Sequence, residues 1–393
     1  MNLRVSNPAR LQPGALLGIL GGGQLGRMMA MAARSMGYRV RVLDPDPQCP
    51  ASFVADEVIV GHWGDVVAAC SLAKGCDAVT LEIEQIGLDS LRAVAEIAPL
   101  RPGVEPVRII QDKILQKTWL RDAGFPVGDF EIVNREEDLR GAVDRLGGKV
   151  FLKTARGGYD GRGQARIGFD ATATDEQLLA AWHSIGSRPA IAEKALDLDV
   201  EISVMAARNP SGEVRAYPAS RNHHEKQILA WSVTPAGVSD EHEARAEKIA
   251  AEIIARIGIE GLLCVECFVT REGELLVNEL APRPHNSYHQ SERACATGQF
   301  EQAVRAALNL PLGETTLVQP AAIINLLGDL WLDAPNGQPD FARGLEIAGV
   351  RLHLYEKHTP RRARKMGHLS AVGSTADEAQ ARAKVAFEAI QKK

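Results

Sequence analysis

The sequence predicts a protein that joins an α/β domain to α+β units, and three observations predict it. Strand-like and helix-like segments alternate over roughly the first hundred residues, which is typical of a parallel sheet with crossover helices. A proline-marked stretch, PLRPGVEP at 99–106, then ends this alternation. From residue 149 onward, strand-like pairs flank single helices. A chain of 393 residues is long enough for two to three such domains.

The N-terminal part is expected to form a Rossmann-like parallel sheet with a glycine-rich first turn. Its elements follow in the order LLGIL (16–20), a helix from Gln24 to about Met36, YRVRVLD (38–44), DEVIVG (56–61), a helix near 66–74, and DAVTLEIE (77–84). Gly21, Gly23 and Gly26 fit G-x-G-x-x-G, and Asp44 stands where an acidic residue would bind an adenosine ribose. A nicotinamide-dependent dehydrogenase and plain strand-to-helix packing are both compatible with this turn.

The rest of the chain predicts a central and a C-terminal unit. A helix at DKILQKTWLRDA (112–123) opens the central unit. The further elements are KVFLKT (149–154), a glycine loop (155–163), QARIGF (164–169), a helix at 175–185, AIAEKA (190–195), VEISVMAA (200–207), a helix near 242–257, a hairpin at 261–282, strands at 321–328, 351–357 and 367–373, and a last helix that begins near Ser374 or Thr375. We expect domains at 1–111, 112–310 and 311–393, with a lid subdomain at about 149–208.

Composition narrows the functional class. Hydrophobic residues make up 45% and charged residues 24% of the chain, with a net charge of -5, so neither a membrane nor a nucleic acid is expected as the main partner. We find no signal-peptide pattern and expect a cytoplasmic protein. Of six cysteines, only Cys264 and Cys267 form a C-x-x-C, and because they lie in a strand-like run we interpret them as core thiols.

The hairpin at 261–282 is predicted to place two carboxylates face to face. A two-residue turn at Glu272-Gly273 sets Glu266 opposite Glu279, on a face that also carries Leu275 and Val277. Opposed like charges on an apolar sheet need compensation, which a divalent cation supplies. Magnesium, which binds a few carboxylates together with substrate phosphates, fits this pattern. The alternative is two rim glutamates paired with lysines.

The glycine loop ARGGYDGRG is the second chemical signal. It sets four glycines between two strands, where their free φ angles let the backbone fold over phosphates and present N–H groups. Lys153 before the loop and Lys113 at the start of a helix are both able to reach a phosphate as point charges. A solvated surface role is the alternative for either lysine alone.

Taken together, these motifs resemble the ATP-grasp superfamily and, within it, the N5-carboxyaminoimidazole ribonucleotide synthetases, which are ATP-dependent carboxylating ligases of purine synthesis. GGGQLGRM, DKILQK, GGYDGRGQ, ECFV, NELAPRPHNS and RKMGHL occur in the order that the family shows, over nearly the whole chain. The resemblance implies an ATP-grasp fold, ATP and Mg2+ as cofactors, bicarbonate and 5-aminoimidazole ribonucleotide as substrates, and a homodimer.

The resemblance also implies roles for matching positions. The positions for ATP are Lys113, Lys153, Gly158, Tyr159, Asp160, Gly161, Arg162, Gly163, Gln164, Glu193, Lys194, Ala195, Leu196, Glu201, His224, Asn278 and Glu279. Magnesium is assigned to Glu266 and Glu279. Bicarbonate and carboxyphosphate are assigned to Arg283, His285 and Asn286, with Lys357 nearby. The positions for the ribonucleotide are Gln24, Leu25, Glu82, Tyr159, Asp160, Arg162, Lys357 and Arg364.

Several alternatives remain at this stage. A formate-dependent glycinamide ribonucleotide transformylase shares the first turn, the EIE segment and the late basic cluster, although GGYDGRGQ and PRPHNS fit the bicarbonate enzyme better. A non-catalytic ATP-binding module would keep the hairpin acids but need not keep Arg283, His285 or Lys357. The sequence leaves open whether Glu82 or Glu84 faces the ligand.

Overall fold

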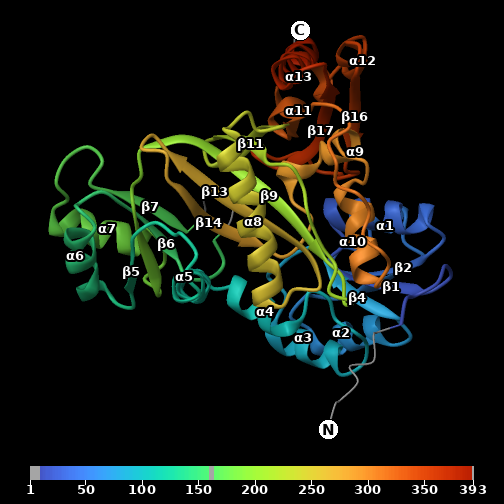
Figure 1. The fold of residues 1–393 in the computed structure, drawn as a ribbon, viewed down its shortest axis with the longest axis horizontal. Coiled ribbons are helices and arrows are strands. Elements are labelled where there is room, and N and C mark those ends of the chain that lie inside the picture. Colours follow the sequence, from blue (N-terminus) through green and yellow to red (C-terminus); the bar gives the residue numbers. More distant parts are fainter. Residues whose placement is uncertain (1–8, 159–162, 392–393) are drawn as a thin grey trace.

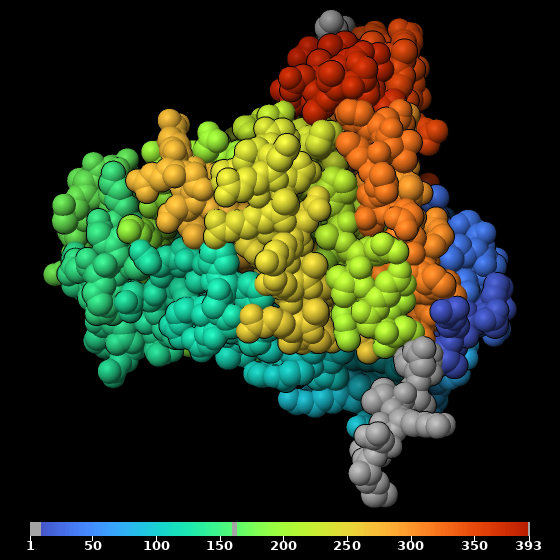
Figure 2. All heavy atoms as spheres, in the orientation of Figure 1, coloured from blue at the N-terminus to red at the C-terminus, as the bar shows by residue number. Residues whose placement is uncertain are grey.

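The computed structural model describes residues 9–158 and 163–391 and shows three lobes around a long central sheet (Figure 1). The first domain lies below and to one side, the small lid sheet lies at the far left, and the C-terminal residues form a separate knob at the top, which the space-filling view also shows (Figure 2). Within the described ranges, no helix has the length and apolar character needed to cross a membrane.

The first domain is a parallel sheet, as the sequence predicts, and its strands lie in the order β3-β2-β1-β4. Its elements are β1 (Leu16–Leu20), α1 (Gln24–Ser35), β2 (Arg39–Asp44), η1 (Pro50–Phe53), β3 (Glu57–Val60), α2 (Val66–Ala73), β4 (Ala78–Leu81), α3 (Leu88–Ala95) and α4 (Val104–Ile110). Strand β1 is fully buried because helices cover both faces of the sheet. Strand β4 ends at Leu81, so residues 82–84 (EIE), which follow it, lie at the carboxyl edge of the sheet, where ligands of such folds bind.

The lid is a four-stranded antiparallel sheet in the order β5-β8-β6-β7, with two helices on one face. Helix α5 (Lys113–Asp122) precedes it, and its elements are β5 (Phe130–Val133), α6 (Glu136–Arg145), β6 (Val150–Thr154), β7 (Gln164–Ile167), α7 (Asp175–Ser184) and β8 (Ala190–Lys194). The small sheet therefore starts earlier in the chain than our expected lid range, and β9, which that range includes, belongs to the central sheet. We overlooked β5 because FEIV is short and lacks clear alternation.

The central sheet has nine strands and continues from the central domain into the C-terminal one. Its strands are β9 (Leu198–Arg208), β10 (Val214–Ala216), β11 (Ser220–Glu225), β12 (Ile228–Thr234), β13 (Gly261–Thr270), β14 (Leu275–Ala281), β15 (Ala321–Leu327), β16 (Val350–Leu354) and β17 (Lys365–Val372). The helices are α8 (Asp240–Ile257), η2 (Asn286–Tyr288), α9 (Ser291–Ala294), α10 (Gln299–Ala307), α11 (Asp329–Asp333), η3 (Pro335–Gly337), α12 (Phe341–Leu345) and α13 (Ala376–Gln391). Because β12 pairs with β15, the two domains share one sheet.

Candidate active site

The hairpin β13–β14 sets Glu266 directly opposite Glu279, in the register that the sequence predicts. The predicted turn is nevertheless wrong. Thr270 N donates to Glu274 O (2.9 Å), so the loop has three residues rather than two, and an irregularity after Glu266 restores the register. Because of this irregularity, Leu275 and Val277 lie on the opposite face of the hairpin from the two acids. They pack into the apolar core behind the sheet.

Both hairpin acids have cationic partners. Lys113 Nζ lies 2.5 Å from Glu279 Oε1, and His285 Nε2 lies 3.2 Å from Glu266 Oε1. Glu279 thus has the lysine partner of our alternative interpretation, whereas Glu266 does not. Burial alone would raise the pKa of Glu266, but its hydrogen bond with His285 and the nearby cationic side chains lower it to about 2. Two carboxylates at opposed positions, with Asn278 as the unpaired residue of β14 next to Glu279, fit the donor set of a magnesium ion.

A second group of charges joins the lid to helix α5. Glu193 on β8 forms ion pairs with Lys153 on β6 and with Lys117 on α5, the latter at 3.0 Å. Burial opposes ionisation of Glu193, but the charges of the two lysines outweigh it and lower its pKa. Lys117 is a residue that our sequence analysis missed, since a lysine in the middle of a helix carries no local signal. In the exit segment after Glu193, the Lys194 side chain turns outward to Asp129 (3.2 Å), and the N–H groups of Lys194 and Ala195 donate to Asp129 O and Lys149 O.

The glycine loop is described only at its ends. Tyr159, Asp160, Gly161 and Arg162 lie outside the described residues. Gly163 has φ +69°, and a Cβ atom there would lie 2.6 Å from Thr154 Oγ1, so this position requires glycine. Gln164 pairs with Lys153 in the β6–β7 register, which places the end of the loop beside that lysine.

Strands β9 and β11 add a further acid–base pair. His224 Nδ1 lies 2.5 Å from Glu201 Oε2, and both side chains are partly exposed. Burial lowers the pKa of His224, but its hydrogen bond to Glu201 and the charge of that carboxylate outweigh burial and raise the pKa. The two residues assigned to ATP by resemblance are therefore neighbours in space.

Arg283 and His285 are held by contacts that the sequence alone did not reveal. Arg283 pairs with Glu84 of the first domain through Nε and through Nη2, the latter 3.1 Å from Glu84 Oε1. His285 Nδ1 lies 2.8 Å from Ser287 Oγ. Burial disfavours the protonated His285, but the Cys264 sulfur and the Glu266 carboxylate beside it raise its pKa to about 10. We therefore describe His285 as an imidazolium at neutral pH.

Asn286 is buried without a partner for its amide. Its side chain is 7% exposed, and neither Oδ1 nor Nδ2 has a hydrogen-bond partner in the part of the chain that the structure describes. Buried polar atoms are rarely left unpaired, so an unpaired amide beside Arg283 and His285 indicates a place where a polar ligand binds.

The glycine turn of the first domain is occupied by the protein's own carboxylates. Glu82 accepts hydrogen bonds from Gly23 N (2.6 Å) and Gly26 N (2.7 Å), and Asp44 accepts one from Gly22 N (2.9 Å). Gly21 has φ +102°, and a Cβ atom there would lie 2.4 Å from Glu82 Cγ. Asp44 is thus not presented to a ribose, and Glu82 stabilises the start of α1. The sequence left open whether Glu82 or Glu84 faces the ligand. In the structure, Glu82 holds the glycine turn and Glu84 holds Arg283.

The C-terminal basic cluster reaches the same turn. Lys357 Nζ donates to Gln24 Oε1 (2.5 Å) and to Lys365 O (2.8 Å). Arg364 is half-buried in its own loop, where Nη1 donates to Thr359 O (2.6 Å). The structure therefore brings Gln24, which is followed by Leu25 on α1, together with Lys357 from the last domain.

Comparison with known proteins identifies the family. Family models match along the chain: a ribonucleotide synthetase preATP-grasp domain at residues 15–111, an ATP-grasp domain at 118–300, and a phosphoribosylaminoimidazole carboxylase C-terminal domain at 321–382. The N5-carboxyaminoimidazole ribonucleotide synthases of Bacillus subtilis and Brucella melitensis are each 39% identical to this chain, over 94% and 92% of it and 94% and 97% of their own lengths.

The solved structures that match this chain are of enzymes with the same name as these relatives. An ADP complex of N5-carboxyaminoimidazole ribonucleotide synthetase matches with a TM-score of 0.89 at 36% identity, covering 98% of this chain and 99% of that one. The Aspergillus clavatus enzyme in complex with ADP and 5-aminoimidazole ribonucleotide matches with a TM-score of 0.86 at 30% identity, covering 97% and 99%. With its fold and its sequence both matched over almost its whole length, this chain belongs to the N5-carboxyaminoimidazole ribonucleotide synthase family.

Proposed function

We propose that the chain uses ATP and bicarbonate to carboxylate 5-aminoimidazole ribonucleotide. Family membership makes it an ATP-dependent ligase of purine biosynthesis. The observation that carries the proposal is the convergence of Arg283, the His285 imidazolium and the unpaired Asn286 amide beside the paired hairpin acids. Cations and amide donors beside a metal-binding carboxylate pair suit an acyl phosphate made from ATP.

ATP is proposed to bind between the lid and the central sheet. Lys113, Lys153 and the ends of the glycine loop supply positive charge and backbone N–H groups for the phosphates, and the segment after Glu193 supplies backbone groups for the base. Glu201 and His224 would hold the ribose. Glu266 and Glu279 would hold magnesium, which, when bound, neutralises charge on the transferring phosphoryl group.

The proposed reaction has two steps. A bicarbonate oxygen attacks the γ-phosphorus of ATP, the bond to the β-phosphate oxygen breaks, and ADP leaves as carboxyphosphate forms. The exocyclic amine of the ribonucleotide then attacks the carboxyl carbon, inorganic phosphate leaves with the C–O bond electrons, and the amine nitrogen loses a proton. Arg283 and His285, both cationic, would hold carboxyphosphate and shield it from water.

The ribonucleotide is proposed to lie between the first domain and the C-terminal cluster. Gln24, Leu25, Lys357 and Arg364 would surround its phosphate, with Glu82 fixing the turn that presents Gln24. In this proposal, residues 1–111 bind the ribonucleotide, residues 112–310 bind ATP, and residues 311–393 complete the site. A homodimer, cytoplasmic localisation and the Mg2+ requirement belong to the same proposal.

Phosphate release tests the proposal. We expect ATP hydrolysis that depends on Mg2+ and bicarbonate and that becomes coupled to carbamate formation when 5-aminoimidazole ribonucleotide is added. Formate in place of bicarbonate should give no such coupling. Phosphate release that responds to formate and glycinamide ribonucleotide instead would assign the chain to the transformylase activity. Sedimentation analysis would measure the oligomeric state separately.

A further inference from the structure

The first residue of α10, Gln299, holds the backbone of His285 from both sides. Its Oε1 accepts a hydrogen bond from His285 N (2.8 Å), and its Nε2 donates one to His285 O (3.0 Å). Gln299 is 0% exposed, so water does not compete for either bond. Because the N–H and the C=O belong to two consecutive planar peptide groups, this clamp restricts both backbone torsions of His285.

The orientation of the Gln299 amide is unambiguous. A backbone N–H only donates and a backbone carbonyl only accepts, so Oε1 must face the N–H of His285 and Nε2 its carbonyl. Nε2 also lies 3.0 Å from His289 Nδ1, which takes its second hydrogen, and Gln299 N donates to Ser291 Oγ (3.0 Å). The amide therefore cannot turn over without losing these hydrogen bonds.

The chain that carries His285 has few other backbone contacts. Residues 282–285 link β14 to η2, and Pro282 and Pro284 have no N–H to donate. Among the residues that the structure describes, the N–H of His285 is the only one in this link that donates a hydrogen bond, and its acceptor is Gln299. The position of the link therefore depends on the clamp.

The clamp in turn determines where the His285 ring lies. Nε2 of the ring is 3.2 Å from Glu266 Oε1, and Nδ1 is 2.8 Å from Ser287 Oγ. Both distances require the backbone to stay in its observed position. A displacement of about 1 Å would break these contacts, and misplacement on this scale is costly for a group that must meet a reacting substrate.

We propose that Gln299 is a positioning residue that, through the His285 backbone, keeps the cationic ring where it shields carboxyphosphate from water. This inference rests on the proposed function, in which Arg283 and His285 hold that intermediate. With the ring displaced, a water oxygen bonds to the carboxyl carbon in place of the amine. The bond to the phosphate oxygen breaks with its electron pair on the phosphate, the water loses a proton, and bicarbonate and inorganic phosphate form without carbamate.

The experiment measures phosphate released per carbamate formed by the full chain at saturating ATP, bicarbonate and 5-aminoimidazole ribonucleotide. The parent should give a ratio of about one, as the proposed stoichiometry requires. Gln299→Met keeps the shape of the side chain but removes both polar groups, so we expect a ratio of at least about three, with ADP affinity changed less than about threefold. Gln299→Asn is one methylene too short to reach both groups of His285. It should raise the ratio as well and serves as the second variant if Gln299→Met folds poorly.

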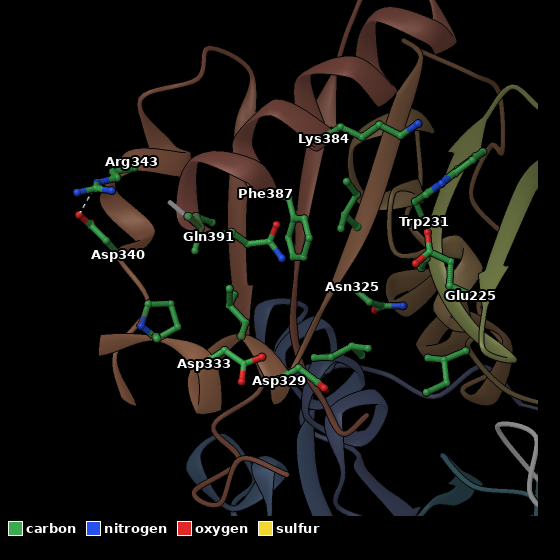
Figure 3. A pocket seen from close by; sticks show the side chains of 18 of the residues that line it. Glu225, Trp231, Asn325, Asp329, Asp333, Asp340, Arg343, Lys384, Phe387 and Gln391 are labelled. Carbon is green, nitrogen blue, oxygen red and sulfur yellow. Dashed lines mark ion pairs between the residues drawn. The ribbon is translucent and has the colours of Figure 1, made fainter. Parts of the chain in front are cut away.

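Gln302 on the same helix provides a matched control. It is also 0% exposed and clamps Gly313 in the same way, with Oε1 accepting from Gly313 N (2.8 Å) and Nε2 donating to Gly313 O (2.9 Å). Gln302→Met should lower the melting temperature as much as Gln299→Met does and leave the ratio at the parental value. Phe387→Leu is a second stability control, because Phe387 lines the cavity between β12 and α13 (Figure 3), which contains no residue of the clamp.

Two results would overturn the proposal on its own. One is a parental ratio in a folded Gln299 variant, and the other is an equal rise in the ratio for Gln299→Met and Gln302→Met. A parent that hydrolyses ATP but forms no carbamate would contradict the proposed function and this inference together, so the two failures are distinguishable.

Discussion

Glutamine in place of Glu84 tests whether the first domain positions Arg283 for carboxylation. The Glu84 carboxylate receives the Arg283 guanidinium through two nitrogens, and the side chains are only 20% and 19% exposed. Removal of one partner of a buried ion pair costs about 3 to 5 kcal/mol. Glutamine keeps one acceptor oxygen and the pair retains some exposure, so we expect a loss of about 2 to 3 kcal/mol in transition-state stabilisation.

This loss corresponds to a roughly 30- to 150-fold fall in kcat/KM for bicarbonate, at about 1.4 kcal/mol per tenfold. The assay is phosphate release at saturating ATP, and the KM for ATP should change less than about threefold. Glu82→Gln is the matched control, because this acid holds the glycine turn and its loss should raise the KM for the ribonucleotide instead. Arg283→Lys, which keeps the charge but loses the two-nitrogen contact, should resemble Glu84→Gln.

A Glu84→Gln variant with parental thermal stability and a kcat/KM for bicarbonate within about threefold of the parent would refute this reasoning. Identical kinetic effects of Glu82→Gln and Glu84→Gln would also refute it. In either case Glu84 would be a structural link between the domains, and Arg283 would keep its position without it.

Three further predictions follow from the site and from the C-terminal sheet. Glu279→Gln should abolish Mg2+-dependent ATP turnover with little change in melting temperature, and turnover near the parental level would exclude the hairpin as the metal site. Arg364→Ala should raise the KM for the ribonucleotide by roughly 10- to 100-fold with ATP affinity unchanged, measured by initial rates; an unchanged KM would place this arginine outside the pocket. Burial lowers the pKa of His289 and of His368, which stack at 4.7 Å, so stability should be full above about pH 6.5 and fall as the pH decreases through that value. His289→Phe should make this fall shallower by about 1.4 kcal/mol per pH unit in urea unfolding between pH 5 and 6, and equal slopes would contradict it.

Sequence reasoning worked best where local pattern determines the structure. The alternation in the first domain predicted its four strands and the helices α1 and α2, whereas α3 and α4 were not predicted. The hairpin shows the limit. Its turn was predicted with one residue too few, and Asn278, which no pattern marks as an irregular position, compensates for the difference. Glu266 and Glu279 were therefore matched correctly, but the faces of Leu275 and Val277 were not.

Contacts between distant segments were beyond local reasoning. Lys117 lies within a helix and Glu84 lies after a strand, and neither has a neighbour in sequence that indicates its partner. Only the packing of α5 against the lid brings Lys117 to Glu193, and only the docking of the first domain brings Glu84 to Arg283. The family resemblance supplied roles for Glu193 and Arg283, which are the partners of these two residues. It did not indicate which side chains hold Glu193 and Arg283 in place.

The glycine turn of the first domain shows why a motif alone does not determine a ligand. The pattern G-x-G-x-x-G requires close approach of an acceptor to backbone N–H groups, and a dinucleotide pyrophosphate is one acceptor that satisfies it. Here the carboxylates of Glu82 and Asp44 occupy three of these groups from within the protein. Because Gly21 lies against Glu82 itself, the glycines are needed for this internal contact whether or not any nucleotide binds. The turn is then free to orient Gln24 toward Lys357, which suits a substrate held between two domains rather than a cofactor held by one.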